Sequence, residues 1–400
     1  MSLQKVTNNA IIISPRLILY VLVISFHINS CVNPLDIGEQ NAREGILVIQ
    51  GSISDQPGPY TVRLYRTTSA DNVLEAVQPV SAKAVSIHDD TGQSESLNLS
   101  ADGFYTTSAG GIQGVVGRKY QVRVELQNGN IFESEPEELY PGGVIDSLYY
   151  QWESLSLADG GFINGFRVFI DARSLNPDQF VRWKFSGTYM AESFPHLNKY
   201  EPNCSKPEPP PHTPDPLPCS GYITTGVRTR FGLSLGDLIQ VGDCTCCVCY
   251  VNDAEDKPHL NNDVISSEGT YKKIEVGFVR FDEWTFGHGK YMLKVEQMSL
   301  SQDAFQFWKI IKDQKEGANS LFQPAFGRST TNLRSVNSTQ EVLGYFFATS
   351  INKKVRFLTP DDSPIPVPDY AINPEDNCAL WRSCTDIFPY SSLTPPPDWE

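Results

Sequence analysis

The sequence predicts an all-β protein: an N-terminal immunoglobulin-like sandwich followed by a larger β-sandwich-like domain with one inserted α-helix. Apolar and polar residues alternate in nearly every apolar run, and Gly, Pro, Asn and Asp separate these runs. Alternation with a period of two turns one face of a strand toward a core and the other toward water. Because a single long stretch has helical periodicity, we expect less than about 15% helix.

The immunoglobulin-like sandwich is predicted over residues 45–141. Its short runs include YTVRLY, in which Tyr60, Val62 and Leu64 share a face, and YQVRVEL, in which Tyr120, Val122, Val124 and Leu126 do. The sequence QNGN after the second run predicts a hairpin, because Asn-Gly tolerates the positive φ of tight turns. Five to seven short strands in about 100 residues are typical of such a sandwich.

The larger β domain is predicted over residues 142–358, and the stretch LYPGGVIDS marks the boundary near residue 142. Its runs are longer and more aromatic. Two of them carry apolar faces, formed by Phe166, Val168 and Ile170 and by Val181, Trp183 and Phe185. The alternation again indicates strands with one buried face.

The inserted helix is predicted near residues 301–315. Ser299 and Gln302 have the spacing of a capping box, and Gly317 stands where a helix would end. The helical stripe consists of Ala304, Phe307, Trp308 and Ile311. An aromatic stripe of this kind indicates packing against a core.

Two segments are rich in proline, an insert at residues 204–219 and a C-terminal strap at residues 359–400. Proline donates no backbone hydrogen bond, so neither segment is expected in the centre of a sheet. Both are predicted to be surface loops or extended straps.

The N-terminus has the pattern of an export signal. Residues 1–30 contain Lys5 and Arg16, no acidic residue, and the apolar run LILYVLVISF. This run is shorter than the roughly 20 residues of a membrane-spanning helix. The stretch from Ile28 to Cys31 resembles a bacterial lipobox, although Asn29 departs from the usual small residue. The resemblance implies lipidation of Cys31, with residues 31–44 as a tether; an ordinary cleaved signal peptide is the alternative.

The charge of the chain argues against nucleic acid as a partner. The formal net charge is −15, and removal of the leader takes away two positive charges. An acidic surface repels phosphate backbones and anionic lipid headgroups. The lipid on Cys31 therefore remains as the expected attachment to a membrane.

Eight cysteines remain after Cys31, and four of them crowd into the stretch CTCCVCY. They are Cys204, Cys219, Cys244, Cys246, Cys247, Cys249, Cys378 and Cys384. An even number in an oxidising compartment favours disulfides. The spacing Cys-x-Cys-Cys-x-Cys is interpreted as unlike the pairs of usual zinc knuckles, although zinc and free thiols stay open as alternatives. If the stretch is extended, alternate cysteines face opposite sides and suit distant partners, including cysteines at the ends of the proline-rich segments.

Other chemistry is discounted on context. GLSLG matches the nucleophile elbow of hydrolases, but Ser234 lies in a strand-and-loop pattern without the required helix. The histidines outside the leader form no ligand motif; they are His88, His196, His212, His259 and His288. The acidic stretch with Asp253, Glu255, Asp256 and Asp263 lacks calcium-loop spacing and is interpreted as a solvated loop. We therefore expect no catalytic residue, no metal and no cofactor.

Several stretches together resemble a family of Bacteroidota outer-membrane lipoproteins that bears only a domain-of-unknown-function name. They are the lipobox, NPLDIG, ILVIQGSISDQPGPYTVRLYRT, AFQFWKIIKDQ, LFQPAF, VLGYFFATS and the tail PPPDW. Genes of this family often neighbour TonB-dependent receptors. The resemblance implies a non-enzymatic accessory or ligand-capture lipoprotein that acts beside a TonB-dependent β-barrel receptor. The alternatives are a free-standing surface module that binds glycan or protein, and a hydrolase.

Overall fold

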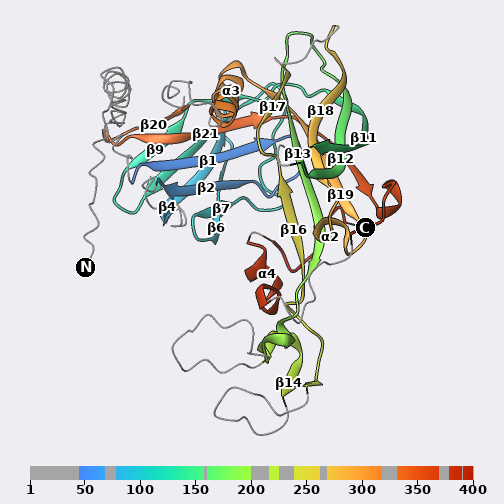
Figure 1. The fold of residues 1–400 in the computed structure, drawn as a ribbon. Helices are drawn as coiled ribbons and strands as arrows, with labels where there is room; N and C mark the ends of the chain where they lie inside the picture. Colours follow the sequence, from blue (N-terminus) through green and yellow to red (C-terminus); the bar gives the residue numbers. More distant parts are fainter. Residues whose placement is uncertain are drawn as a thin grey trace, which may run out of the picture. The chain divides into compact units, whose positions relative to one another are not determined.

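The computed structural model describes residues 45–67, 78–156, 160–199, 216–224, 238–261, 268–317, 331–368, 378–389 and 391–399. Strands account for 51% of the structure and helices for 13%. The predicted all-β, sandwich-type fold and low helix content are therefore confirmed (Figure 1). The leader, the tether with Cys31, and the residues Cys204, His212, Ser234 and Asp263 lie outside the described residues.

The first sandwich consists of two sheets that share one apolar core. One sheet has the order β21 (Val342–Thr349), β1 (Leu47–Ser54), β2 (Thr61–Arg66), β7 (Phe104–Thr106) and β6 (Asn98–Ala101), with β3 (Gln78–Pro79) beside β2. The other has the order β20 (Leu333–Ser335), β9 (Ile131–Ser134), β8 (Lys119–Leu126), β4 (Ala82–Asp89) and β5 (Ser94–Ser96), with β10 (Glu137–Glu138) beside β8. Both sheets contribute residues to the same buried cluster.

The predicted alternation places the core residues of this sandwich correctly. Tyr120, Val122, Val124 and Leu126 of β8 are all buried, while the residues between them are at least partly exposed. The predicted hairpin follows, with Gly129 at φ +83° between β8 and β9. Its turn closes through the Leu126 N–H, which donates to the Asn130 carbonyl at 2.9 Å.

The second sandwich pairs a sheet of β11 (Val144–Ser156), β12 (Phe162–Arg173) and β18 (Thr270–Arg280) with a second sheet. That sheet has the order β16 (Val248–Ala254), β13 (Phe180–Glu192), β19 (Tyr291–Leu300) and β22 (Ile351–Leu358), with β17 (His259–Leu260) beside β13. The two predicted aromatic faces lie in the shared core, where Phe166 and Trp183 are fully buried. A two-stranded ribbon of β14 (Tyr222–Thr224) and β15 (Leu238–Gln240) extends the second half of the chain.

Two late strands return to the first sandwich. β21 runs parallel to β1, and β20 pairs with β9, although both follow most of the second sandwich in sequence (Figure 1). After Ser350 the chain continues as β22 in the other sandwich. Residues 333–349 therefore share sheets and an apolar core with the first sandwich. The predicted domain boundaries stay a prediction.

The long helix α3 (Gln302–Gly317) lies close to the predicted position, and two short helices, α2 (Glu283–Phe286) and α4 (Cys384–Ile387), are added to it. The N-terminal cap of α3 differs from the prediction. Ser301 Oγ accepts the Ala304 N–H at 3.1 Å, whereas the predicted cap Ser299 belongs to β19. The predicted stripe of α3 packs with Tyr345 and Phe347 of β21 and with Phe180 of β13. The helix therefore covers strands of both sandwiches.

A buried carboxylate lies at this junction. Glu137 of β10 is 5% exposed, and its carboxylate accepts hydrogen bonds from the hydroxyls of Ser301 and Tyr345. The Asn332 amide donates to the same carboxylate at 3.4 Å. Burial raises the pKa of Glu137 above its ordinary value, and the hydrogen bonds oppose this only in part.

We predict that Glu137→Gln stabilises the fold at neutral pH. Since the folded state raises the pKa of Glu137, its contribution to stability is fully present below the unfolded pKa and is lost as pH rises through the folded pKa. Urea denaturation from pH 4 to pH 8 should show a smaller loss of stability with rising pH in the variant. The control is Glu138→Gln, at the neighbouring position of β10, which should follow the wild-type profile. A variant that is destabilised at neutral pH would show that the junction requires the charge.

Candidate functional site

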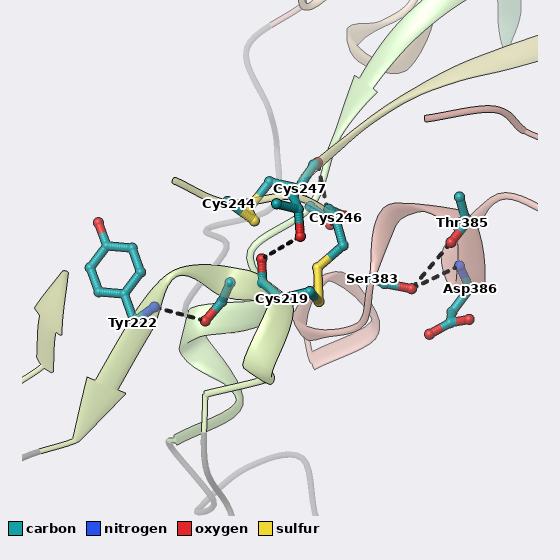
Figure 2. Close-up of a disulfide and its surroundings, with 11 residues drawn as sticks. Cys219, Tyr222, Cys244, Cys246, Cys247, Ser383, Thr385 and Asp386 are labelled. Atoms are coloured by element: carbon teal, nitrogen blue, oxygen red, sulfur yellow. Dashed lines mark hydrogen bonds between the residues drawn. A yellow bond between two sulfur atoms is a disulfide. The ribbon is translucent and has the colours of Figure 1, made fainter. Parts of the chain in front are cut away.

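The cysteine cluster forms three disulfides in the described residues. Cys219 pairs with Cys246, Cys244 with Cys247, and Cys249 with Cys384. Figure 2 shows the first of these beside η3 (Pro218–Ser220), with Ser383 of the C-terminal segment nearby. The predicted disulfide chemistry is therefore present at six of the eight candidate positions. Cys204 and the side chain of Cys378 lie outside the described residues, so their pairing stays a prediction.

The expected geometry of the cluster was wrong in one respect. Cys244 and Cys247 lie in a bend before β16 and bond to each other, so Cys247 has no distant partner. The two residues are three apart, and the cluster therefore contains a Cys-x-x-Cys pair after all. Since all four cluster sulfurs are oxidised, none is a thiolate that could bind zinc. No group of His, Cys, Asp and Glu suited to a metal occurs in the described part of the chain.

The Cys249–Cys384 disulfide fixes the C-terminal segment to the edge of a sheet. Both residues are fully buried, and the Cys384 N–H also donates to the Cys246 carbonyl at 2.8 Å. Further along, Tyr250 and Ser392 exchange two backbone hydrogen bonds of 2.7 and 3.0 Å. The loop closed by this disulfide spans 135 residues. Loop-closure entropy gives such a bond roughly 5 kcal/mol of stabilisation.

A pocket of about 470 Å³ lies next to this attachment. It shares Tyr189, Val251 and Phe388 with the small apolar cluster around Cys249 and Cys384. Its walls come from β13, β16, the end of β18, α2 and the residue after α4. The lining residues are Tyr189, Val251, Asn252, Asp253, Phe278, Arg280, Asp282, Trp284, Thr285 and Phe388.

The aromatic walls of the pocket are held by neighbouring rings. Trp284 and Phe388 meet edge to face with centroids 5.8 Å apart. Tyr189 stacks on the buried Tyr291 at 6.2 Å. Phe388 owes its position to Cys384, because α4 begins at that cysteine and its cap Ser383 accepts the Asp386 N–H. The disulfide thus supplies one wall of the pocket.

Two carboxylates and a guanidinium give the pocket its polarity. Asp253 accepts a 2.8 Å hydrogen bond from the Tyr291 hydroxyl, and burial raises the pKa of its carboxyl, with Asp282 adding to the shift. Asp282 caps α2 by accepting the Thr285 N–H at 2.9 Å. Burial also raises the pKa of Tyr189 to about 12, so its hydroxyl stays protonated. Arg280 adds an exposed cation on the same wall.

The acidic stretch after the cluster differs from its interpretation as a solvated loop. Asp253 lies near the end of β16, a strand that lines the pocket. Glu255 forms a nearly buried ion pair with Arg182. The Arg182 guanidinium also lies 3.7 Å from the centre of the Trp308 ring, which secures α3. The short apolar run from Val248 to Val251 was the available signal for a strand here.

Histidines in the described residues contact aromatic, hydroxyl or carboxylate groups. His196 stacks on Tyr222 at 4.9 Å, and burial lowers the pKa of His259. His88 accepts or donates a 2.7 Å hydrogen bond with the Ser86 hydroxyl. Their interpretation as non-ligand residues stays a prediction.

The family follows from comparison with known sequences. The model of a domain of unknown function, DUF4249, matches residues 32–355. The chain belongs to the DUF4249 family. No curated protein matches this DUF4249 chain. In the described residues of the DUF4249 fold, no helix has the length and apolar character needed to cross a membrane.

We predict that replacing Cys249 and Cys384 together by Ser lowers the free energy of unfolding by about 2–5 kcal/mol, because the unfolded chain regains the entropy of a long loop. Guanidinium denaturation of the exported protein measures this change. The matched control replaces Cys244 and Cys247, which close a loop with a sequence separation of only 3. Equal losses in the two double variants would contradict the loop-length argument.

Proposed function

We propose that this protein is a non-enzymatic outer-membrane lipoprotein that captures a ligand beside a TonB-dependent receptor. The leader ending at Cys31 supports the lipid anchor, and the acidic charge of the chain supports attachment by lipid rather than by headgroup binding. The family resemblance supports the receptor as neighbour. The observation that carries ligand capture is the pocket next to the Cys249–Cys384 disulfide.

The chemistry of the pocket favours a sugar as the captured ligand. A sugar ring presents C–H groups on its faces, which pack on aromatic walls such as Trp284 and Phe388. Its hydroxyls both donate and accept, so they can use the carboxylate acceptors Asp253 and Asp282 and the donor Arg280. Pockets that combine apolar walls with a few polar groups of this kind are typical of small-molecule sites.

A free-standing glycan-binding module is the second candidate, and the same aromatic and carboxylate lining favours it. The two candidates differ in the receptor and agree on the pocket. Affinity purification of the lipoprotein from its own outer membrane separates them: a β-barrel receptor that copurifies supports the accessory role, and retention on glycan without a receptor supports the free-standing module.

We predict that Trp284→Ala weakens the binding of a neutral oligosaccharide by at least about tenfold, because a stacked aromatic contact of about 1.5 kcal/mol is lost. Isothermal titration with cello-, xylo-, manno- and malto-oligosaccharides measures the affinity. The matched control is Phe162→Ala, which removes an aromatic ring that is 67% exposed on β12. Binding that is unchanged by Trp284→Ala and Phe388→Ala would place the ligand elsewhere.

The same titration, repeated at different pH values, tests the contribution of the Asp253 carboxylate to binding. Since burial raises the pKa of Asp253, its carboxylate takes up a proton at a higher pH than an ordinary aspartate and then loses one acceptor. Affinity should fall as pH decreases toward that raised pKa. Asp253→Asn should bind more weakly at neutral pH and flatten the profile, whereas the exposed Asp102→Asn should leave it unchanged.

We predict that Cys31→Ser moves the protein from the outer membrane to the soluble fraction, because the thioether-linked lipid is lost. Membrane fractionation followed by immunoblotting measures this distribution. The control is Ser30→Ala, which keeps a small residue before the cysteine and should stay in the membrane fraction. Equal membrane retention of Cys31→Ser and the wild type would show that the anchor lies elsewhere.

A further inference from the structure

The three described disulfides differ in how easily a thiol can reach them. Cys249 and Cys384 are both fully buried. In the Cys219–Cys246 bond, Cys246 is 6% exposed and Cys219 is half-buried. Among the described disulfides, Cys244–Cys247 is the one in which both cysteines are half-buried; of the two residues between them, Thr245 is exposed and Cys246 is buried. Thiol–disulfide exchange needs the attacking thiolate to approach a sulfur directly, so access decides which bond reacts.

Of the three described disulfides, the Cys244–Cys247 bond also closes the shortest loop and so contributes least to the stability of the fold. It closes a loop with a sequence separation of 3, against 27 for Cys219–Cys246 and 135 for Cys249–Cys384. Opening such a short loop returns little entropy to the chain. Its removal therefore leaves the other two attachments, η3 and α4, in place.

Backbone hydrogen bonds hold the loop independently of this disulfide. The Thr245 N–H donates to the Cys219 carbonyl at 2.8 Å, and the Ser193 N–H donates to the Cys247 carbonyl at 2.7 Å. The Cys384 N–H donates to the Cys246 carbonyl between them at 2.8 Å. Two reduced thiols would therefore remain at Cα atoms 5.7 Å apart, a separation from which a disulfide forms again without movement of the backbone.

We propose that Cys244–Cys247 is a thiol–disulfide exchange site for the dithiol of a partner protein. A partner thiolate attacks one sulfur of the pair, forming a mixed disulfide and releasing the other sulfur as a thiolate. The second thiolate of the partner then attacks the partner's own sulfur in the mixed disulfide. Two electrons and two protons pass to Cys244 and Cys247, and the partner is left with a disulfide.

Graded reduction of the native protein tests the proposal. The exported protein is treated with increasing dithiothreitol at constant pH, quenched with acid, alkylated and mapped by mass spectrometry. We expect alkylation of Cys244 and Cys247 together at least about tenfold faster than alkylation of Cys219, Cys246, Cys249 or Cys384. Simultaneous reduction of all three bonds, or earlier reduction of Cys219–Cys246, would overturn the proposal.

Re-oxidation and trapping complete the test. After removal of dithiothreitol the same pair should close again, whereas a new bond between Cys246 and either thiol would overturn the claim of a reversible site. A thioredoxin with its second cysteine replaced by Ser should form a mixed disulfide with Cys244 or Cys247. The double variant C244S/C247S should keep the thermal midpoint and lose both the fast alkylation and the trapped adduct. An adduct at any other cysteine, or none with the wild type, counts against the exchange site.

Discussion

The parallel pairing of β1 with β21 is the contact on which the rest of the fold depends. It joins Leu47–Ser54 to Val342–Thr349 across most of the chain, and it requires glycine at one position. Gly344 has φ +102°, and a Cβ there would overlap the Ile49 carbonyl. With β21 in place, Phe346 and Ala348 enter the first core, while Tyr345 and Phe347 on the other face receive α3.

The position of β21 also fixes the position of the pocket, because the strands of the second sheet follow from it in order. The chain passes through Ser350 into β22, and β19, β13 and β16 follow across the sheet. Thr349 and Ser350 hydrogen-bond to Ser299 of β19, which secures the crossing between the two sandwiches. The strand farthest from β22, β16, carries Cys249 and Asp253 and so forms the edge at which the C-terminal segment attaches.

Period-two alternation predicted many of the strands that form the two cores, because burial on one face is a local property of the sequence. It did not predict β16, whose acidic end was interpreted as a loop. Alternation did not predict that β21 would pair with β1 of the first sandwich. This pairing closes a loop of about 300 residues, and a local sequence pattern carries no information on the entropy cost of closing it. The cysteine count predicted disulfides, but their pairing depends on Cα separations in the folded chain. The pocket was missed for the same reason: Tyr189, Arg280 and Trp284 lie on separate elements, and only the sheet order brings them together.

The disulfides concentrate where the apolar core is smallest. The cluster that joins β16 to α4 contains Ala191, Cys249 and Cys384, with Tyr189, Val251 and Phe388 packed around it. Burial of so few side chains, at about 25 cal/mol per Å², offsets only part of the entropy of ordering a proline-rich C-terminal segment. The first sandwich, whose core is larger and contains no cysteine, needs no such bond. Burial holds the first sandwich together, whereas the Cys249–Cys384 disulfide holds the pocket wall at β16. The disulfide fixes Phe388 in place, and the Phe388 ring lines the open pocket.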